Sequence, residues 1–444
     1  MQEEHVRQRE DSDFHLSHSL KNERWKHFNS CCLNLNITLP KQVSNVVTTL
    51  VEKQSIRQAV TIFMCNLLSI KGDFTLAYSR RNFTLPKVYN KRNISYVKII
   101  QAAEWIVQNG YALEQRGNAS SNPELRFSSY LWPTPKLLEL FGKPVKDQLN
   151  IDYVKTQVCV ILRDADKKEV EYVQTKEVKA MSVDMEMINL NNHKFNFTDP
   201  YGRDLNCSNL TRIFSEDFRF GGRLYRTDAH RIKQDNDDKM QTRLGIRIDG
   251  MVVVEIDFCN LHAMMLCAIE NINTVDYHGD IYDFVLRKCY LDYAEQDRKL
   301  VKQAMNIMLN TETGEKAIQA IQGLINAQPM NQLRWTFVSG KVVWQMIYDC
   351  MPPFQKYFDN PNKIGMRLQR MDSDIAVRVC NHFVSRNRPV IPVHDSFIVW
   401  DIDGDDLLRA MTDAFKHVTK CPSNFPVFFR VESAYFPTEK VVMY

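Results

Sequence analysis

Apolar residues recur along the N-terminal third of the chain at spacings that predict helices. Residues 41–70 carry two such segments. A third helix is expected over residues 96–109, because Ser95 can cap its first turn and Gly110 can end it in a left-handed turn. The apolar face of this helix is formed by Ile99, Ile100, Ala103, Ile106 and Val107.

A predicted β-hairpin follows this helix. Residues 111–115 and 124–129 have the pattern of strands, and the polar, turn-forming segment 116–123 lies between them. Helices followed by a hairpin with a polar tip resemble a winged helix. Residues 77–130 contain eight Lys or Arg against three Glu, an excess that can hold phosphates or can simply form a solvated basic face. The candidate nucleic-acid contacts are Arg80, Arg81, Lys91 and Arg92.

The next segment is expected to connect two larger units. Residues 158–162 predict a strand, and a turn is expected at residues 164–166. Asp184-Met185-Glu186 has the Asp-x-Glu form of a proofreading exonuclease, but Met181, Met185 and Ile188 recur at helical spacing. Because little chain remains for a separate exonuclease domain, we interpret this segment as an ordinary helix and expect no proofreading.

Two aspartates in the C-terminal half follow apolar strands. Residues 252–258 predict a buried strand that carries Asp257, and a helix is expected over residues 261–270. Residues 390–400 predict two short strands around His394 and Asp395. An acid at the end of a buried strand is costly without a partner. Two such acids on adjacent strands can hold two Mg²⁺ ions, with Mn²⁺ as a substitute.

A basic helix face is predicted between these two aspartates. Residues 297–310 read as a helix on which polar residues four apart share one side. The guanidinium of an Arg can grip phosphate oxygens, and a Lys can act there as a point charge. The residues on this face are Arg298, Lys302, Asn306 and Asn310.

Composition limits the class of protein only broadly. The chain has 444 residues, enough for two or three domains, with 44% hydrophobic and 25% charged residues. No run of about 18 apolar residues predicts a membrane span, so no membrane partner is expected. Eleven cysteines without a C-x-x-C pair argue against a zinc ribbon. The charged N-terminus resembles neither a signal nor a transit peptide, which favours the cytoplasm.

The order of the motifs resembles that of the family A DNA polymerases. Gly222-Arg223-Leu224-Tyr225-Arg226-Thr227-Asp228 resembles the family's Gly-Arg-Leu-Ser-Ser-Thr-Asp segment, and Asp257-Phe258-Cys259-Asn260-Leu261-His262 resembles motif A. The remaining landmarks follow in the family's order over about residues 215–444: Asp276-Tyr277-His278, Arg298 and Lys302 of motif B, Gln369 to Ile375, His394-Asp395 of motif C, and the closing strand Phe425 to Glu432.

The resemblance implies a role for each matching residue. Asp257 and Asp395 would bind the metals together with Phe258, and Arg298 and Lys302 would hold the triphosphate, with Lys302 a candidate acid toward pyrophosphate. The incoming nucleotide would also meet Phe258, His262, Asn306 and Asn310, with His262 at the position of the glutamate that excludes a 2′-hydroxyl. Contacts to the primer-template would come from Arg223, Gln369 and His394.

Some residues depart from the family pattern and leave alternatives open. Asn306 and Asn310 replace aromatic residues, and motif C reads His394-Asp395-Ser396. The latter form, with Gly222-Arg223-Leu224-Tyr225, is similar to the single-subunit RNA polymerases of bacteriophages. The alternatives are therefore an RNA polymerase or primase-like enzyme, and a DNA-binding replication factor with an inactive polymerase fold.

The sequence thus predicts an α+β fold with a right-hand polymerase palm, built on an antiparallel sheet, and helical fingers. We expect a winged-helix-like nucleic-acid-binding domain at residues 1–145, a connecting or thumb-like region at 146–214, and palm and fingers at 215–444. The expected activity is that of a nucleotidyltransferase, a DNA-directed DNA polymerase that uses dNTPs and a DNA primer-template. A compact polymerase beside a winged helix is associated with the replication of plasmids, phages or other mobile elements.

Overall fold

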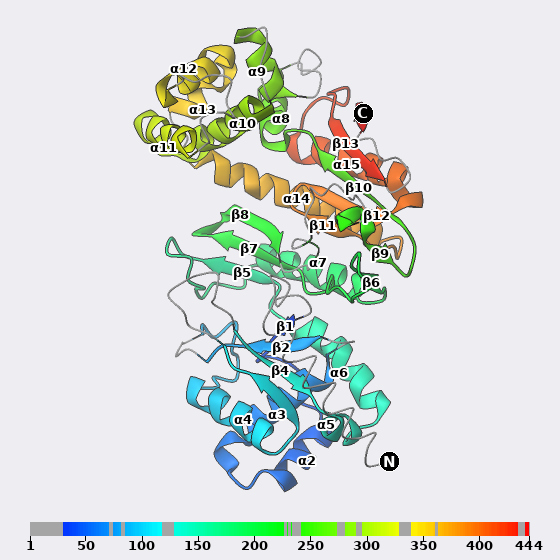
Figure 1. Cartoon of the computed structure of the whole chain (residues 1–444). Helices are drawn as coiled ribbons and strands as arrows, with labels where there is room; N and C mark the ends of the chain where they lie inside the picture. The colour runs from blue at the N-terminus through cyan, green and yellow to red at the C-terminus, as the bar shows by residue number, and fades with distance from the viewer. Residues whose placement is uncertain are drawn as a thin grey trace.

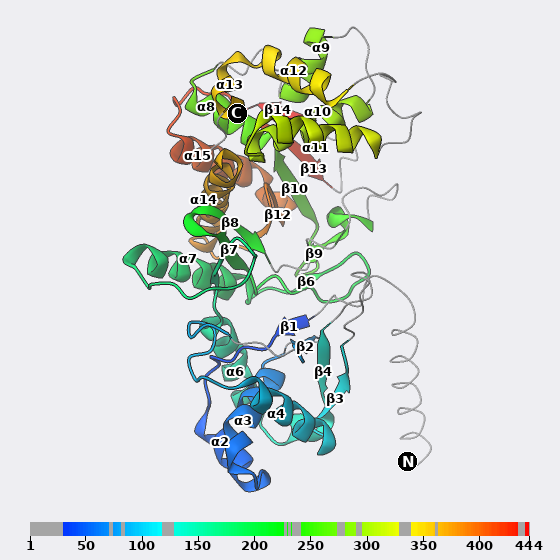
Figure 2. The ribbon, with the colours of Figure 1, turned by 90° about the vertical axis from the view of Figure 1, so that its left-hand side faces the viewer.

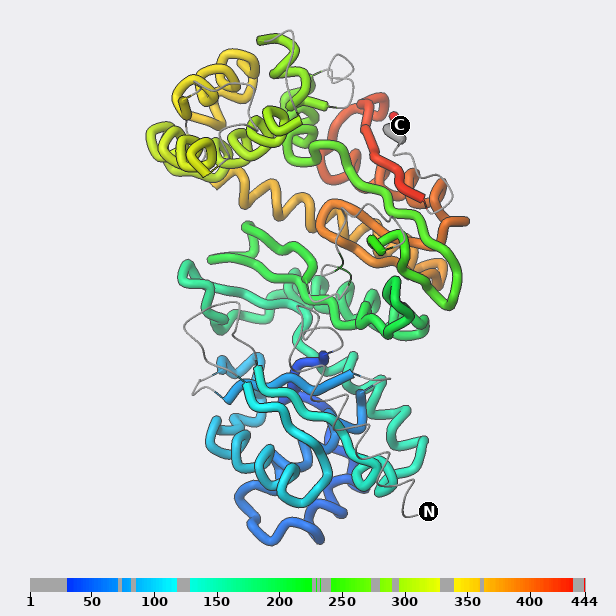
Figure 3. The backbone as a smooth tube through the Cα atoms, in the orientation of Figure 1, coloured from blue at the N-terminus to red at the C-terminus, as the bar shows by residue number. Residues whose placement is uncertain are grey.

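The structure is a computed structural model, and it shows an elongated molecule with its N-terminal part at one end (Figure 1). It describes residues 30–70, 74–80, 85–117, 128–225, 229, 232, 241–272, 280–289, 295–327, 339–359, 363–433 and 440–443. The tube in Figure 3 follows the chain from this end through a middle layer to the C-terminal part. No helix among the described residues is long and apolar enough to cross a membrane.

The N-terminal part packs helices against a four-stranded sheet. The strands lie in the order β1 (Ser30–Cys32), β2 (Thr75–Tyr78), β4 (Ser129–Pro133) and β3 (Ala112–Gln115). Strands β1 and β2 are parallel, and the other pairs are antiparallel. The helices are α2 (Lys41–Leu50), α3 (Arg57–Leu68), α4 (Tyr96–Gln108), α5 (Pro135–Glu139) and α6 (Lys143–Thr156), with a short 3₁₀ turn at Gln54–Ile56 before α3.

The predicted helices and hairpin of this part are present. Helix α4 begins after Ser95, whose hydroxyl accepts a hydrogen bond from the Lys98 N–H, and Gly110 follows it with φ of 72°. Strands β3 and β4 form the hairpin, and the second strand contains Ser129, as predicted, but continues to Pro133. Most of the predicted tip lies outside the described residues, which resume at 128.

Helix α6 runs across the predicted boundary at residue 145. Its buried residues Leu149 and Tyr153 belong to the same apolar core as α3 and β2. Helix α6 also packs on the helix at Lys176–Asn192, so the predicted boundary at residue 145 remains a prediction. The division into three domains is likewise retained as a prediction.

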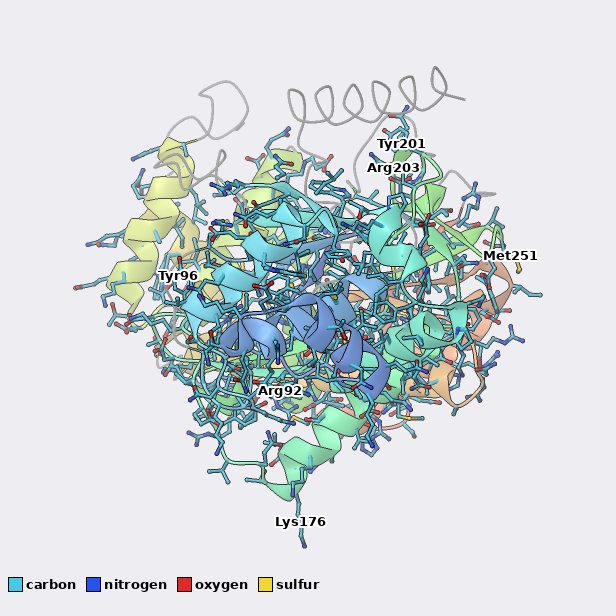
Figure 4. The ribbon with its side chains drawn as sticks, turned by 90° about the horizontal axis from the view of Figure 1, so that it is seen from below. Arg92, Tyr96, Lys176, Tyr201, Arg203 and Met251 are labelled. Carbon is cyan, nitrogen blue, oxygen red and sulfur yellow. The ribbon has the colours of Figure 1, made fainter. Side chains whose placement is uncertain are left out.

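The middle layer holds a three-stranded sheet and one long helix. Strand β7 (Thr211–Ser215) pairs in parallel with β5 (Val160–Arg163) and antiparallel with β8 (Asp217–Tyr225). A short pair is formed by β6 (Phe197–Thr198) and β9 (Arg247–Ile248). Helix α7 (Lys176–Asn192) buries Met181, Met185 and Ile188, so the helix predicted over the Asp-x-Glu segment is confirmed. Figure 4 shows Lys176 at the start of α7 pointing away from the body.

The C-terminal part is built on a five-stranded antiparallel sheet. Its order is β11 (Ile391–Val393), β12 (Ser396–Trp400), β10 (Val253–Phe258), β13 (Phe428–Ser433) and β14 (Lys440–Met443). Helices α8 (Leu261–Ile269) and α15 (Gly404–Thr419) pack beside it (Figure 1). The strand predicted at residues 252–258, the helix after it and the two strands around His394-Asp395 are therefore confirmed.

A group of helices lies to one side of this sheet (Figure 1). It contains α9 (Ile281–Cys289), α10 (Glu295–Asn310), α11 (Gly314–Asn326), α12 (Gly340–Cys350) and α13 (Gln355–Asp359). Helix α14 (Ile364–Val384) packs on both β8 and α15, and in Figure 2 it lies between the middle layer and the C-terminal sheet. The helix predicted at residues 297–310 is confirmed as α10, and the whole fold is a mixed α and β arrangement.

A buried arginine joins the middle sheet to α14. The Arg212 guanidinium donates to the Gly222 carbonyl (3.1 Å), the Ser373 hydroxyl and the Asp374 carboxylate (2.5 Å each for Nη2). Gly222 has φ of 86°, and a Cβ there would lie 2.6 Å from Phe214. Only glycine fits at this bend without strain. The next residue along β8 is Arg223, so the bend fixes the position of the Arg223 backbone.

Candidate active site

One cavity collects every predicted site residue of the C-terminal part. It has a volume of about 450 Å³ and lies where the five-stranded sheet meets α8, α10 and α14. Its lining comes from residues as far apart in the chain as Arg223 and Arg430. The predicted residues in its wall are Arg223, Asp257, Phe258, His262, Arg298, Lys302, Asn306, Asn310, Gln369, His394 and Asp395.

One carboxylate of the cavity lies on a strand of the sheet, and a second lies in the turn that precedes the neighbouring strand. In β10, Asp257 is opposite Ser396 of β12 and opposite Arg430 of β13. Asp395 occupies the two-residue turn just before β12, and its carbonyl accepts a hydrogen bond from the Phe258 N–H (3.3 Å). His394 allows this tight turn by taking a left-handed conformation with φ of 58°. The strand pairing therefore brings together two acids that are far apart in the sequence.

The surroundings of Asp257 disfavour its charge. Burial raises the pKa of Asp257 well above its usual value, and the nearby acids Asp395 and Glu255 add to the shift, while Arg430 and Lys302 oppose it. Oδ1 of Asp257 is shielded from solvent and has no hydrogen-bond partner among the described residues. An unpaired buried carboxylate oxygen is costly, and a divalent cation would satisfy it.

The two aspartates form a donor set of the kind that Mg²⁺ takes. No group of three or more His, Cys, Asp or Glu that could hold a metal ion is found within the described part of the chain. Mg²⁺ is commonly bound by one or two carboxylates plus waters and substrate phosphates, and Asp257 and Asp395 supply that pair. The Phe258 side chain has no ligating atom, so Phe258 can contribute only its backbone carbonyl oxygen.

Helix α10 presents its polar face to the same cavity. Leu300, Val301 and Ala304 are buried on the opposite side, which turns Arg298 and Lys302 toward the opening. The Arg298 Nε donates to Asp280 Oδ2 at 2.5 Å, and the guanidinium lies 5.7 Å from the centre of the Tyr282 ring. These two cations can bind the phosphates of a ligand whose reacting end lies at the aspartates.

A second charged network forms the wall near α14. Arg223 Nε donates to Asp372 Oδ2 at 2.6 Å, and Arg223 Nη2 lies 3.2 Å from His262 Nε2. The rings of Tyr225 and His394 meet edge to face, 6.0 Å apart. Lost solvation and the positive charge of Arg223 lower the pKa of His394 below its usual value, which favours a neutral ring at neutral pH.

Several residues of this site escaped the sequence analysis. Asp280, Tyr282 and Arg430 line the cavity, and Asp372 lies directly behind it. Asp280 also caps α9 by accepting hydrogen bonds from the N–H groups of Tyr282 and Asp283 (3.1 and 3.0 Å), which is its one local signal. The landmark predicted at residues 276–278 and the segment 226–228 lie outside the described residues.

The predicted basic patch of the N-terminal part is only partly available. Arg80 pairs with Glu104 (2.7 Å) and Glu114 (2.9 Å), and Arg92 donates to the carbonyls of Leu35 (2.7 Å) and Ile37 (2.8 Å). Both arginines therefore hold the unit together, which favours a structural role over the predicted phosphate contact. Figure 4 shows where Arg92 lies on the underside.

The remaining cations of this region keep the nucleic-acid prediction open. Lys91 and its neighbour Lys87 are exposed and line one surface pocket, together with Lys155 of α6. Two acids, Glu171 and Glu186, line the same pocket. Arg81 lies outside the described residues.

Replacing Lys87 and Lys91 with Ala is expected to weaken DNA binding for all sequences. Each lost phosphate contact should reduce the slope of log affinity against log salt by up to about 0.9. The measurement is binding of a fluorescent duplex at several salt concentrations. Lys176→Ala removes an equally exposed charge from α7 and serves as the control, and an unchanged slope in the double variant would exclude a phosphate contact here.

Comparisons with known proteins do not assign the chain to a family. No family model matches the chain, and no curated protein matches it. One similar solved structure is the POL domain of Pol1 from M. smegmatis in complex with DNA primer-template and dNTP, with 10% identity, 90% of this chain and 66% of that chain covered, and a TM-score of 0.35. The chain thus spans just under two thirds of the length of that domain. A TM-score this low does not support any inference about the function of this chain, which must be judged from the cavity.

Proposed function

We propose that this chain is a template-directed DNA polymerase that adds nucleotides to a 3′-hydroxyl. The observation that carries the proposal is the cavity in which Asp257 of β10 and Asp395, from the turn before β12, face the cationic side of α10. Phosphoryl transfer needs positioning and charge neutralisation more than covalent chemistry. A pair of acids for metals with Arg298 and Lys302 for phosphates meets that need.

The proposed mechanism assigns a task to each side of the cavity. Asp257 and Asp395 would hold two Mg²⁺ ions, which would lower the pKa of an attacking hydroxyl and neutralise the charge of a pyrophosphate leaving group. Arg298, oriented by Asp280, binds the triphosphate through its guanidinium, and Lys302 adds a second positive charge. Lys302 is also the proposed acid toward pyrophosphate.

The opposite wall is proposed to hold the primer-template. Arg223, Gln369 and His394 are positioned there by β8, α14 and the β11–β12 turn. A neutral His394 can donate one hydrogen bond to the primer terminus. Because the ring is uncharged, it does not form an ion pair with the carboxylates that would hold the metals. His262, Asn306 and Asn310 are left to contact the incoming nucleotide.

The deciding experiment is extension of primed and unprimed DNA and RNA templates with dNTPs or NTPs and Mg²⁺. Extension of primed DNA with dNTPs is the expected result. A preference for NTPs would replace the proposal with an RNA polymerase or primase-like activity. Retained DNA binding without any extension would favour a replication factor with an inactive polymerase fold.

A further inference from the structure

Three charged or ionisable side chains from three elements meet at one wall of the cavity. Arg223 comes from β8, His262 from the first turn of α8 and Asp372 from the middle of α14. Arg223 Nε lies 2.6 Å from Asp372 Oδ2, and Arg223 Nη2 lies 3.2 Å from His262 Nε2. Arg223 and His262 line the cavity, whereas Asp372 does not. Any effect of Asp372 on a ligand must therefore pass through its two neighbours.

The hydrogen bonds in this network have a defined direction. A guanidinium can only donate, so His262 Nε2 must accept the hydrogen bond from Arg223. The distance of 3.8 Å between His262 Nε2 and Asp372 Oδ2 is too long for a competing hydrogen bond. With Nε2 accepting, the ring proton of His262 lies on Nδ1.

Another histidine of the same chain shows the opposite arrangement. His382, also on α14, places Nε2 at 3.0 Å from Asp406 Oδ2. A carboxylate accepts, so Nε2 of His382 carries a proton. The neighbour of Nε2 is a donor at His262 and an acceptor at His382, so the pair His382–Asp406 provides a matched control.

Asp372 is the buried acid that anchors the network. Its side chain is only 2% exposed, and it is the acid that pairs with the partly exposed guanidinium of Arg223. Without this carboxylate, the Arg223 guanidinium would lose the contact that aims its second nitrogen at His262.

We propose that Asp372 is a positioning residue that, through Arg223, holds His262 as the Nδ1–H tautomer and thereby sets the preference between deoxyribose and ribose. The proposal rests on the proposed function. The α-phosphate of a nucleotide must lie at Asp257 and Asp395, and the sugar follows the α-phosphate directly. His262 is the second residue of α8, and its side chain lines the same cavity as Asp257 and Asp395, within reach of this sugar.

The first test follows the tautomer directly, without any turnover. Protein labelled with ¹⁵N-histidine is measured by NMR, with the His262 signals assigned by His262→Gln. The wild type should show His262 with the proton on Nδ1, and Asp372→Asn should lose this fixed state. Arg223→Lys, which keeps the charge but removes the fork, should lose it as well. Asp406→Asn should leave His262 unchanged. A wild-type His262 with its proton on Nε2, or an unaltered signal in Asp372→Asn, would overturn the proposal.

The second test measures the ratio of kcat/KM for dATP to that for ATP on one primed template. Asp372→Asn is expected to reduce this ratio about tenfold, in the range that one displaced contact group contributes to discrimination. Asp406→Asn should keep the wild-type ratio. A changed tautomer with an unchanged ratio would refute the sugar role, and a wild type that extends nothing would refute the proposed function while the NMR result still decides the positioning role.

Discussion

Asp257→Ala and Asp395→Ala are each expected to abolish nucleotide addition. Each replacement removes one of the two carboxylates that the strand pairing of β10 and β12 brings together. Metal-bound phosphoryl transfer gains several kcal/mol of transition-state stabilisation from its cations, which corresponds to about a thousandfold or more in rate. Single-turnover extension with dNTPs and Mg²⁺ measures this loss.

The control is an acid of the same chain that lies outside the cavity. Asp283 of α9 is ion-paired with Arg287 on the helix surface, so Asp283→Ala should extend primers at the wild-type rate. Near-normal extension by either Asp257→Ala or Asp395→Ala would contradict the assignment of these acids to the metals.

Asp257→Asn separates loss of activity from loss of structure. Burial, followed by Asp395 and Glu255, raises the pKa of Asp257 in the folded protein. Ionised Asp257 therefore lowers the free energy of unfolding once the pH rises above about 4, the pKa of an aspartate in the unfolded chain. The metal-free Asn variant should be at least as stable as the wild type at neutral pH, and this difference should vanish below about pH 4. Thermal unfolding at both pH values measures it.

Arg298→Ala and Lys302→Ala are each expected to reduce transition-state stabilisation by about 2 to 4 kcal/mol. This loss corresponds to a decrease of about thirty- to a thousandfold in kcat/KM for the dNTP. Each removes a cation from the face of α10 that lines the cavity. Arg298 should have the larger effect, because Asp280 already holds its guanidinium in place and a preorganised fork loses less entropy on binding phosphate.

Lys299 provides a matched control on the same helix. It is adjacent to Arg298 in sequence but pairs with Glu295, with its side chain 60% exposed. Lys299→Ala should leave dNTP use unchanged. If Arg298→Ala and Lys302→Ala instead used dNTPs normally but bound primer-template poorly, this face of α10 would contact the nucleic-acid backbone and not the triphosphate.

Local pattern was enough to predict the elements that carry the candidate site. The apolar run before Asp257, the short strands around Asp395 and the helical spacing of Arg298 and Lys302 each depend on neighbours within one element. The structure contains those elements as β10, β11, β12 and α10. The order of the motifs along the chain also identified which residues belong together, and one cavity collects them.

Only the tertiary structure decided which charges face each other. Arg430 lies opposite Asp257 through strand pairing, and Asp372 reaches Arg223 through the packing of α14 on β8. Arg80 and Arg92 carry the charge expected of a phosphate-binding patch. In the structure, however, Arg80 forms ion pairs with acids and Arg92 donates hydrogen bonds to backbone carbonyls of other segments. A sequence determines the charge of a side chain and the period of its element. The direction and partner of that charge depend on contacts between residues far apart in the chain, which exist only after the elements have packed.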